Sequence, residues 1–156
     1  MNGVSVFSHL ALMDGSPVPL AKYGGNVTII VNTASLCSFA ASNIRHLTQM
    51  QRSWGTRGFT ILAFPCSQFA NQEPKSAEEI SSWVASSGIN FPVFDKVKVS
   101  GPDAHPLFKG LQSSLGPIRW NYTKFVCSRA GMPYAKFHPT SGIDEVERCV
   151  SLLCEE

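Results

Sequence analysis

The sequence predicts an α/β fold in which helices flank a central mixed sheet. Three observations predict this class. The runs 27–32 and 59–64 are apolar and have the composition of buried strands. A segment with helical spacing of apolar residues follows each run. Two short strand-like segments around Gly131 then precede a last helical segment. Strands that alternate with helices indicate a sheet covered on both faces.

The N-terminal part predicts a small β-hairpin. Residues 7–12 are its first strand, and the turn is expected within Gly15-Ser16-Pro17-Val18-Pro19. Residues 20–25 follow as a short helical turn that ends at Gly24-Gly25. The first strong strand of the central sheet, 27–32, begins directly after it.

The middle of the chain predicts two helices around a second core strand. The first helix covers 43–54, and its apolar residues are Ile44, Leu47, Met50 and Trp54. The second core strand, 59–64, ends at Pro65, and a polar loop follows it. Ser76 and Glu79 then have the spacing of a capping box, which predicts the start of the second helix.

The C-terminal part predicts a strand, a helix, a hairpin and a last helix. The strand is Phe91–Phe94, and a weaker helix covers 103–115. The segments 124–127 and 134–137 are expected to pair as an antiparallel hairpin. Ser141 is expected to cap the last helix. His105 stands directly before Pro106 at a helix start, where a structural hydrogen bond is the expected role.

This order of elements matches a thioredoxin-like layout with an N-terminal hairpin, because a βαβ unit comes first and an antiparallel ββα unit last. The 156 residues suffice for one hydrophobic core, so we expect a single domain over 1–156. Fold alone does not specify a function, because one fold carries many sites.

Composition excludes several classes of function. The chain is 44% hydrophobic and 15% charged with a net charge of +2, which does not indicate nucleic-acid binding. Five cysteines without a C-x-x-C pair predict neither a disulfide framework nor a metal site. Such cysteines fit a reducing compartment, and the N-terminus shows no signal pattern. We therefore expect a cytoplasmic location, with an organellar mature form as the alternative.

Cys37 is the main candidate for chemistry. It lies where the strand 27–32 ends and a helix begins, a place where sites collect in α/β sheets. Helix N-terminal amides favour an anion there, and a thiolate is such an anion. The alternative is that Cys37 is one more small buried hydrophobic residue.

Two further loops supply hydrogen-bond donors at the same predicted edge. Gln72 lies in the loop 64–74, and Trp120 and Asn121 lie in the loop 119–125. Carboxamide and indole N–H groups stabilise a sulfur anion and the oxyanion that leaves when a thiolate attacks a peroxide. Taken singly, each of these residues has an ordinary alternative role in a turn or in the core.

The three segments together resemble the signature stretches of the glutathione peroxidase family. Residues 32–37 resemble the first motif, which carries the peroxidatic cysteine or selenocysteine. Residues 62–69 with 72–74 resemble the second, and residues 120–125 the third. By this resemblance Cys37, Gln72, Trp120 and Asn121 form the catalytic tetrad. The implied activity is reduction of hydrogen peroxide and organic or lipid hydroperoxides by a thiol, without metal or cofactor, through a sulfenic acid on Cys37.

The chain also departs from the family pattern. Ser38-Phe39-Ala40 follows Cys37 where the family commonly has Gly, an aliphatic or aromatic residue and Thr. The second helix has no resolving cysteine between 80 and 87. Members with selenocysteine also lack it, so Cys37 is interpreted as standing at a selenocysteine position. Cys66 is expected to be structural, and Cys154 is a weak candidate for a resolving thiol.

The remaining expectations concern partners. The short connection 116–119 resembles the monomeric phospholipid-hydroperoxide type, which implies a monomer with at most peripheral membrane contact. Lys75, Arg119 and Lys124 flank the motifs and are candidates for binding glutathione carboxylates or lipid headgroups. Their alternative is a solvated positive rim. Glutathione or thioredoxin is the implied reductant.

Two other functions stay open. In one, Cys37 is a peroxide sensor that passes its oxidation to a thiol of a partner protein. In the other, the chain is a thioredoxin-like binding module with an inactive site. A dithiol oxidoreductase is disfavoured, because Ala40 stands where the second cysteine of a C-x-x-C pair would be.

Overall fold

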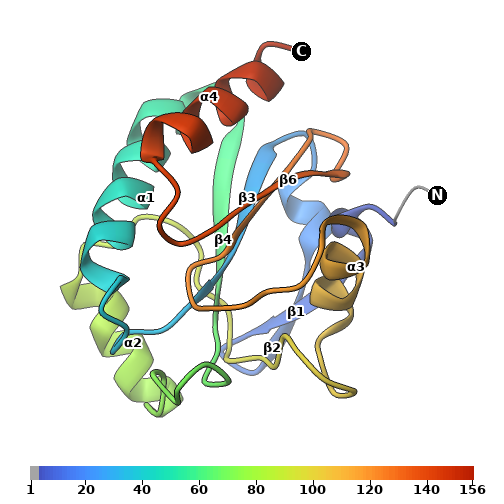
Figure 1. The fold of residues 1–156 in the computed structure, drawn as a ribbon. Coiled ribbons are helices and arrows are strands. Elements are labelled where there is room, and N and C mark those ends of the chain that lie inside the picture. The colour runs from blue at the N-terminus through green and yellow to red at the C-terminus, as the bar shows by residue number, and fades with distance from the viewer. Residues whose placement is uncertain (1–3) are drawn as a thin grey trace.

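The protein is built on a four-stranded mixed sheet, with the strand order β4-β3-β5-β6 (Figure 1). The computed structural model describes residues 4–156, so the first three residues of the N-terminal stretch lie outside it. The strands are β3 (Val27–Thr33), β4 (Phe59–Pro65), β5 (Lys124–Cys127) and β6 (Pro133–Phe137). β3 pairs parallel to β4 and antiparallel to β5, and β5 pairs antiparallel to β6.

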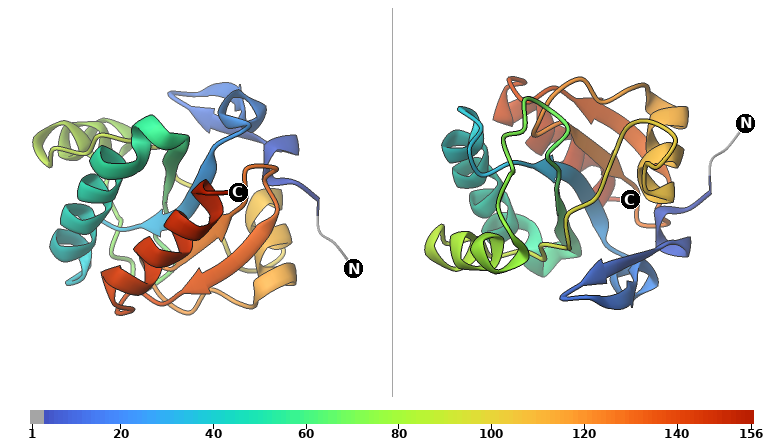
Figure 2. Two further views of the ribbon diagram at one scale, coloured as in Figure 1. Left: turned by 90° about the horizontal axis from the view of Figure 1, so that it is seen from above. Right: turned by 90° about the horizontal axis from the view of Figure 1, so that it is seen from below.

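Four helices cover this sheet. They are α1 (Ala40–Trp54), α2 (Ala77–Ser86), α3 (Pro106–Leu115) and α4 (Ile143–Cys154). Helices α1 and α4 lie on one face, and α3 lies on the other (Figure 2). The predicted mixed sheet flanked by helices is therefore confirmed. Among residues 4–156, no helix is both long and apolar enough to cross a membrane.

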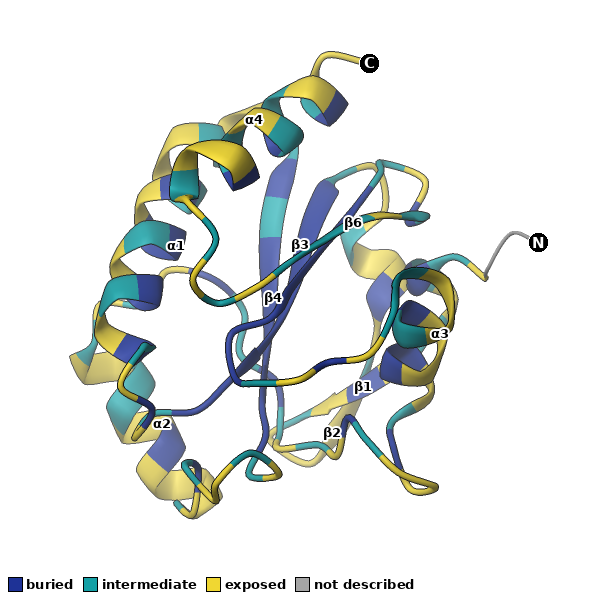
Figure 3. Cartoon of the chain, viewed as in Figure 1, coloured by how far each residue is buried: buried dark blue, intermediate teal, exposed yellow. Residues whose placement is uncertain are grey.

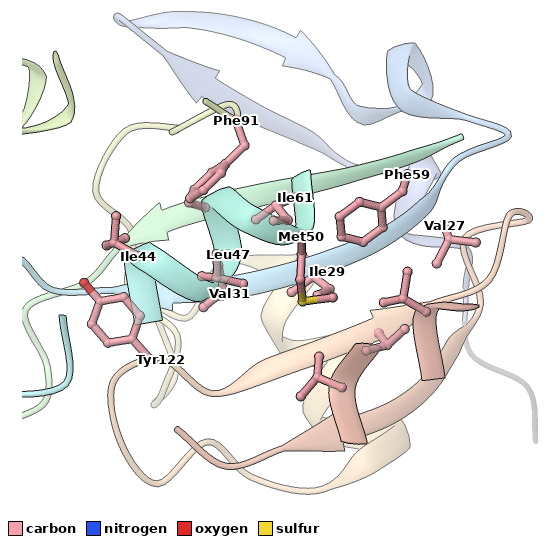
Figure 4. Packing of buried hydrophobic residues seen from close by; sticks show 14 of the residues in the cluster. Val27, Ile29, Val31, Ile44, Leu47, Met50, Phe59, Ile61, Phe91 and Tyr122 are labelled. Atoms are coloured by element: carbon pink, nitrogen blue, oxygen red, sulfur yellow. The ribbon is translucent and has the colours of Figure 1, made fainter. Parts of the chain in front are cut away.

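The alternation of side chains along β3 and β4 produces two separate cores. Ile29 and Ile61 pack with Leu47 and Met50 of α1 on one face (Figure 4). Ile30 and Leu62, the next residues along each strand, point the other way. They pack with Phe108 and Leu111 of α3. In Figure 3, β3 is consequently dark blue, and β4 is dark blue apart from a teal band at Thr60. Burial on both faces explains why these strands are continuous apolar runs.

The N-terminal hairpin is present, but its turn lies earlier than expected. Strands β1 (Leu10–Met13) and β2 (Ser16–Pro19) pair antiparallel, so residues 16–19 form a strand. Asp14 and Gly15 make the turn, with φ of 52° and 78°. Their backbone N–H groups both donate to the Asp95 carboxylate, at 2.9 Å each. That carboxylate lies 80 residues away in the sequence, so local turn preferences did not reveal it.

Two further details differ from the sequence expectations. Gly142, not Ser141, is the N-cap of α4, because the Ser141 hydroxyl instead accepts from the His138 N–H at 3.1 Å. The segment Phe91–Phe94 forms one parallel bridge, between Ala63 and Val93, and no full strand.

Two local predictions are confirmed. Ser76 and Glu79 form the capping box of α2, with both reciprocal hydrogen bonds present. His105 has a structural role: its Nδ1 accepts from the Leu107 N–H at 3.1 Å, and its Nε2 lies 3.0 Å from the Leu10 carbonyl. His105 therefore ties the start of α3 to the hairpin.

Candidate active site

Cys37 lies in the turn that joins the carboxyl end of β3 to α1. Its side chain is 5% exposed and belongs to the core between the sheet and α1. The turn is held by hydrogen bonds from the Cys37 N–H to Ala34 and from the Ala40 N–H to the Cys37 carbonyl, at 3.3 and 2.9 Å. The Phe39 N–H donates to Sγ at 3.4 Å. The sulfur thus receives a backbone amide at the start of a helix that has no side-chain cap.

Gln72 is delivered by the loop that follows β4. The Leu36 N–H, next to Cys37, donates to the Gln72 carbonyl at 3.0 Å, so this loop is fixed to the Cys37 turn. Ala70 and Asn71, directly before Gln72, have φ of 56° and 48°. The left-handed region is disfavoured for residues with a Cβ, and Ala70 has no side-chain polar group to compensate. The backbone conformation before Gln72 is therefore strained.

Asn121 approaches Gln72 from the other side of β3: Gln72 follows β4, and Asn121 precedes β5. Asn121 is fully buried, and its Nδ2 donates to Gln72 Oε1 at 3.0 Å. Tyr122, the next residue, has φ of 63°, and its N–H donates to the Asn32 carbonyl of β3 at 2.7 Å. A bulky residue at positive φ is uncommon, and here it turns the chain so that Asn121 points toward the second loop. The structure thus joins two predicted site residues directly.

Trp120 is half-buried and contacts the second loop and strand β3. Its ring packs edge-on to Phe69 of the second loop, with centroids 6.1 Å apart. Its carbonyl accepts from Asn32 Nδ2 at 3.2 Å. Trp120 packs against the buried cluster that includes Cys37. The three predicted loops therefore meet at the carboxyl ends of β3 and β4.

Glu73 is a site residue to which the sequence analysis gave no role. Its side chain is fully buried, and its two oxygens accept from the Ser35 N–H and the Ser35 hydroxyl, at 2.9 Å each. The one ion pair among residues 4–156 joins Lys98 and Asp103, so Glu73 has no cationic partner there. The sequence signal that could have identified Glu73 as a site residue was its position within the second motif. Glu73 and the Gln72 carbonyl therefore hold Ser35 and Leu36, the two residues before Cys37, by hydrogen bonds.

Tyr122 also contacts the Cys37 turn, and no sequence pattern indicates this contact. Its ring is fully buried (Figure 4), and its hydroxyl donates to the Ala34 carbonyl at 2.9 Å. Burial raises the pKa of Tyr122, so the phenol stays protonated and remains a donor. The turn is thus held at Ala34 by the third loop and at Ser35 by the second.

The three candidate cations do not form one exposed rim. Arg119 is exposed and Lys75 is partly exposed, as expected. Lys124 differs from the expectation of a solvated side chain: it is 3% exposed and its Nζ donates to the Tyr122 carbonyl at 3.1 Å. Burial lowers the pKa of Lys124 to about 8. Lys124 is buried because it lies on β5, a strand that is covered on both faces.

The other four cysteines are also free; Cys66 and Cys127 are buried, and Cys149 and Cys154 are partly exposed. Burial raises the pKa of Cys66, Cys149 and Cys154, and it raises that of Cys127 to about 12. A thiol with a raised pKa supplies little thiolate near neutral pH. Within residues 4–156, no group of three or more His, Cys, Asp or Glu side chains has a metal-binding arrangement.

The chain is similar in sequence to several known proteins. The chain is 43% identical to a probable phospholipid hydroperoxide glutathione peroxidase of Helianthus annuus, over 89% of this chain and 81% of that one. It is 42% identical to a hydroperoxy fatty acid reductase of Synechocystis sp., over 97% and 96%. It is 40% identical to human glutathione peroxidase 7, over 89% and 75%.

Solved structures show the same fold. The crystal structure of T. cruzi GPX1 matches with a TM-score of 0.80 and 28% identity, over 97% of each chain. A thioredoxin family protein from Chlorobium tepidum matches with a TM-score of 0.74 and 20% identity, over 99% of this chain and 98% of that one, which supports the thioredoxin-like fold alone. The family model described as glutathione peroxidase matches residues 6–112. From the family model and these relatives, the chain belongs to the glutathione peroxidase family of peroxidases.

Proposed function

We propose that Cys37 is the peroxidatic residue and that Gln72, Trp120 and Asn121 act on its sulfur and on the bound peroxide. The observation that carries this proposal is the 3.0 Å hydrogen bond between Asn121 and Gln72, in loops that come from different strands. The Asn121 bond to Gln72 Oε1 orients the Gln72 carboxamide and leaves its Nε2–H groups available as donors. The Gln72 loop is itself bonded to the residue beside Cys37.

One buried atom of Asn121 has no hydrogen-bond partner among the described residues. Asn121 Oδ1 is buried and accepts no hydrogen bond from any described residue. Leaving a buried acceptor unpaired costs roughly 1–3 kcal/mol. The role that the contacts support for Asn121 is to hold Gln72, to which its Nδ2 donates.

The proposed reaction has two parts. The Cys37 thiolate attacks the terminal peroxide oxygen, the O–O bond breaks, and an S–OH bond forms while RO⁻ leaves. Donors from Gln72 and Trp120 stabilise the departing oxyanion until it takes a proton and becomes an alcohol or water. A thiol then attacks the sulfenic acid and releases water, and a second thiol displaces Cys37 from the mixed disulfide.

The reductant is proposed to come from outside the chain. Helix α2 has no cysteine, and the four other thiols have raised pKa values. Glutathione and thioredoxin are the two candidates, and exposed Arg119 is the cation best placed to meet a carboxylate. We further propose that the chain acts as a monomer in a reducing compartment, a location that five free cysteines support.

The test is peroxide consumption with each reductant, compared between the wild type and Cys37→Ser. We expect turnover with at least one of the two reductants and none in the variant. A sensor or relay would instead oxidise Cys37 once and turn over slowly with both. If Cys37→Ser consumes peroxide as fast as the wild type, the proposal is wrong. Because a selenol is the stronger nucleophile near neutral pH, we expect Cys37→Sec to turn over faster than the wild type.

A further inference from the structure

A cavity of about 380 Å³ lies between the start of α1 and the start of α4. This volume falls in the range of small-molecule sites, roughly 300–1,000 Å³. Phe39, whose N–H donates to Cys37 Sγ, forms part of one wall, and Lys124 of β5 also lines it. We call this space the Lys124 cavity. It adjoins a backbone segment that contacts the candidate nucleophile.

Lys124 supplies a buried cation to the cavity. Its side chain is 3% exposed, and its ammonium makes one hydrogen bond, to the Tyr122 carbonyl at 3.1 Å. An ammonium carries three N–H donors, so two of them have no acceptor among residues 4–156. The one ion pair in that part of the chain joins Lys98 and Asp103, so no carboxylate neutralises Lys124 there. A buried charge is costly unless it is paired, and an anion in the cavity would pair it.

The N-terminus of α4 opens on the same cavity. Gly142, the N-cap, lines the cavity together with Ile143, and it has no side chain to cap the first turn. The Glu145 and Val146 N–H groups donate to the Gly142 carbonyl. The Ile143 and Asp144 N–H groups have no acceptor among the described residues. Free amides at the start of a 12-residue helix favour an anion.

The walls of the cavity contain donors and no carboxylate. His46 of α1 lines it, and an imidazole carries at least one ring N–H in every protonation state. No Asp or Glu lines the cavity, and the two acidic residues of the first turn of α4, Asp144 and Glu145, are exposed. Donors from a strand and two helices therefore surround one space without an acidic competitor.

We propose that the Lys124 cavity binds the phosphate group of a small, soluble phosphate ester. The terminal oxygens of a phosphate diverge, so they can meet donors from β5, α1 and α4 together, whereas a carboxylate has two coplanar oxygens. The rest of the volume accommodates the organic part of the ester. A lysine with 3% exposure lies below the surface, where a planar bilayer does not reach it. This site is separate from the proposed peroxidase reaction, because its occupancy is measured without peroxide.

Binding is measured by a proton–nitrogen NMR titration at pH 7 and constant ionic strength. Burial lowers the pKa of Lys124 to about 8, so most of its ammonium groups keep their proton at this pH. The probes are glycerol 3-phosphate, inorganic phosphate and acetate. We expect both phosphates to shift the Ile143 and Asp144 amide signals saturably. Acetate should bind at least about tenfold more weakly, because it reaches fewer donors.

Lys124→Met tests the buried cation. The variant removes a charge-assisted hydrogen bond to the ligand and should weaken phosphate binding about tenfold. Lys109→Met is the matched control and should bind as the wild type does. Lys109 is exposed on α3, on the other face of the sheet, and it likewise donates to a backbone carbonyl, that of Pro102.

Gly142→Asp tests the helix amides. Gly142 has φ of −59° and ψ of 137°, which suit an N-cap, and a Cβ there meets no atom within 4 Å beyond its chain neighbours. The new carboxylate should accept from the free N–H groups, raise the urea midpoint and weaken phosphate binding at least about fivefold. Gly142→Ala adds the same Cβ without an acceptor and should keep the binding.

Four outcomes would overturn the proposal. Two are unchanged phosphate binding in Lys124→Met and unchanged phosphate binding in Gly142→Asp. The third is a wild type that shows no saturable shift with either phosphate, or that binds acetate as tightly. The fourth is co-sedimentation with phosphatidic acid vesicles that is lost in Lys124→Met, which would assign the cavity to a membrane headgroup.

Discussion

Replacing Glu73 by Gln tests how the Cys37 turn is held. The carboxylate accepts two hydrogen bonds from Ser35, while the carboxamide keeps one acceptor oxygen and turns an N–H₂ donor toward the other donor. Hydrogen bonds to a charged group contribute about 1.5–3 kcal/mol, so we expect Glu73→Gln to lower the free energy of unfolding by about 2 kcal/mol. The turn then shifts relative to Gln72 and Asn121. Because small displacements from a reactive geometry are costly, we expect the rate of Cys37 oxidation to fall at least about tenfold.

The assay pairs urea unfolding with the rate of sulfenic acid formation on Cys37, trapped and read by mass spectrometry. Ser76→Ala is the control, because removing the N-cap of α2 costs about 1 kcal/mol at a place far along the chain from the sulfur. We expect that control to lose stability and keep its oxidation rate. The reasoning is refuted if Glu73→Gln also keeps its rate while losing stability, because Glu73 would then be structural only.

Three further predictions follow from the same contacts. Gln72→Ala and Asn121→Ala should each slow Cys37 oxidation by about 10²–10³. The double variant should lose less than the product of the two single losses, because the two side chains share a hydrogen bond. A loss equal to that product would contradict a joint role. Tyr122→Phe removes the donor to the Ala34 carbonyl and should lower the free energy of unfolding by about 1 kcal/mol in a urea titration; an unchanged midpoint would show that this bond contributes nothing. The pKa of Lys124 is about 8 in the fold against an ordinary 10.5, so the unfolded chain binds more protons between these values. Stability from this group should therefore rise by roughly 3 kcal/mol from pH 8 to pH 10.5, relative to Lys124→Met, and parallel pH curves for the two proteins would contradict it.

Local patterns in the sequence were enough to predict the sheet and its helices. Burial on both faces makes β3 and β4 continuous apolar runs, and the α2 capping box is contained in four consecutive residues. The turn at Asp14 and the cap of α4 were misplaced because distant or competing hydrogen bonds decide them. Propensity alone does not weigh such bonds.

The candidate site likewise combines features that local sequence patterns predict with contacts between distant residues that they do not. The order of motifs identified the loops of Cys37, Gln72 and Asn121, and the structure joins two of these residues directly. The bond between Glu73 and Ser35 spans 38 residues, so no local pattern announces it. Lys124 is polar in type but sits on a strand with both faces covered, which only the packing of β5 reveals.

The most direct measurement of the central claim is site-resolved mass spectrometry of the reduced protein after one equivalent of hydroperoxide. We predict that a single oxygen atom is found on Cys37, and that Cys66, Cys127, Cys149 and Cys154 stay unmodified, in keeping with their raised pKa values. Oxygen distributed over the five cysteines, or absent from Cys37 while another is oxidised, would contradict the account.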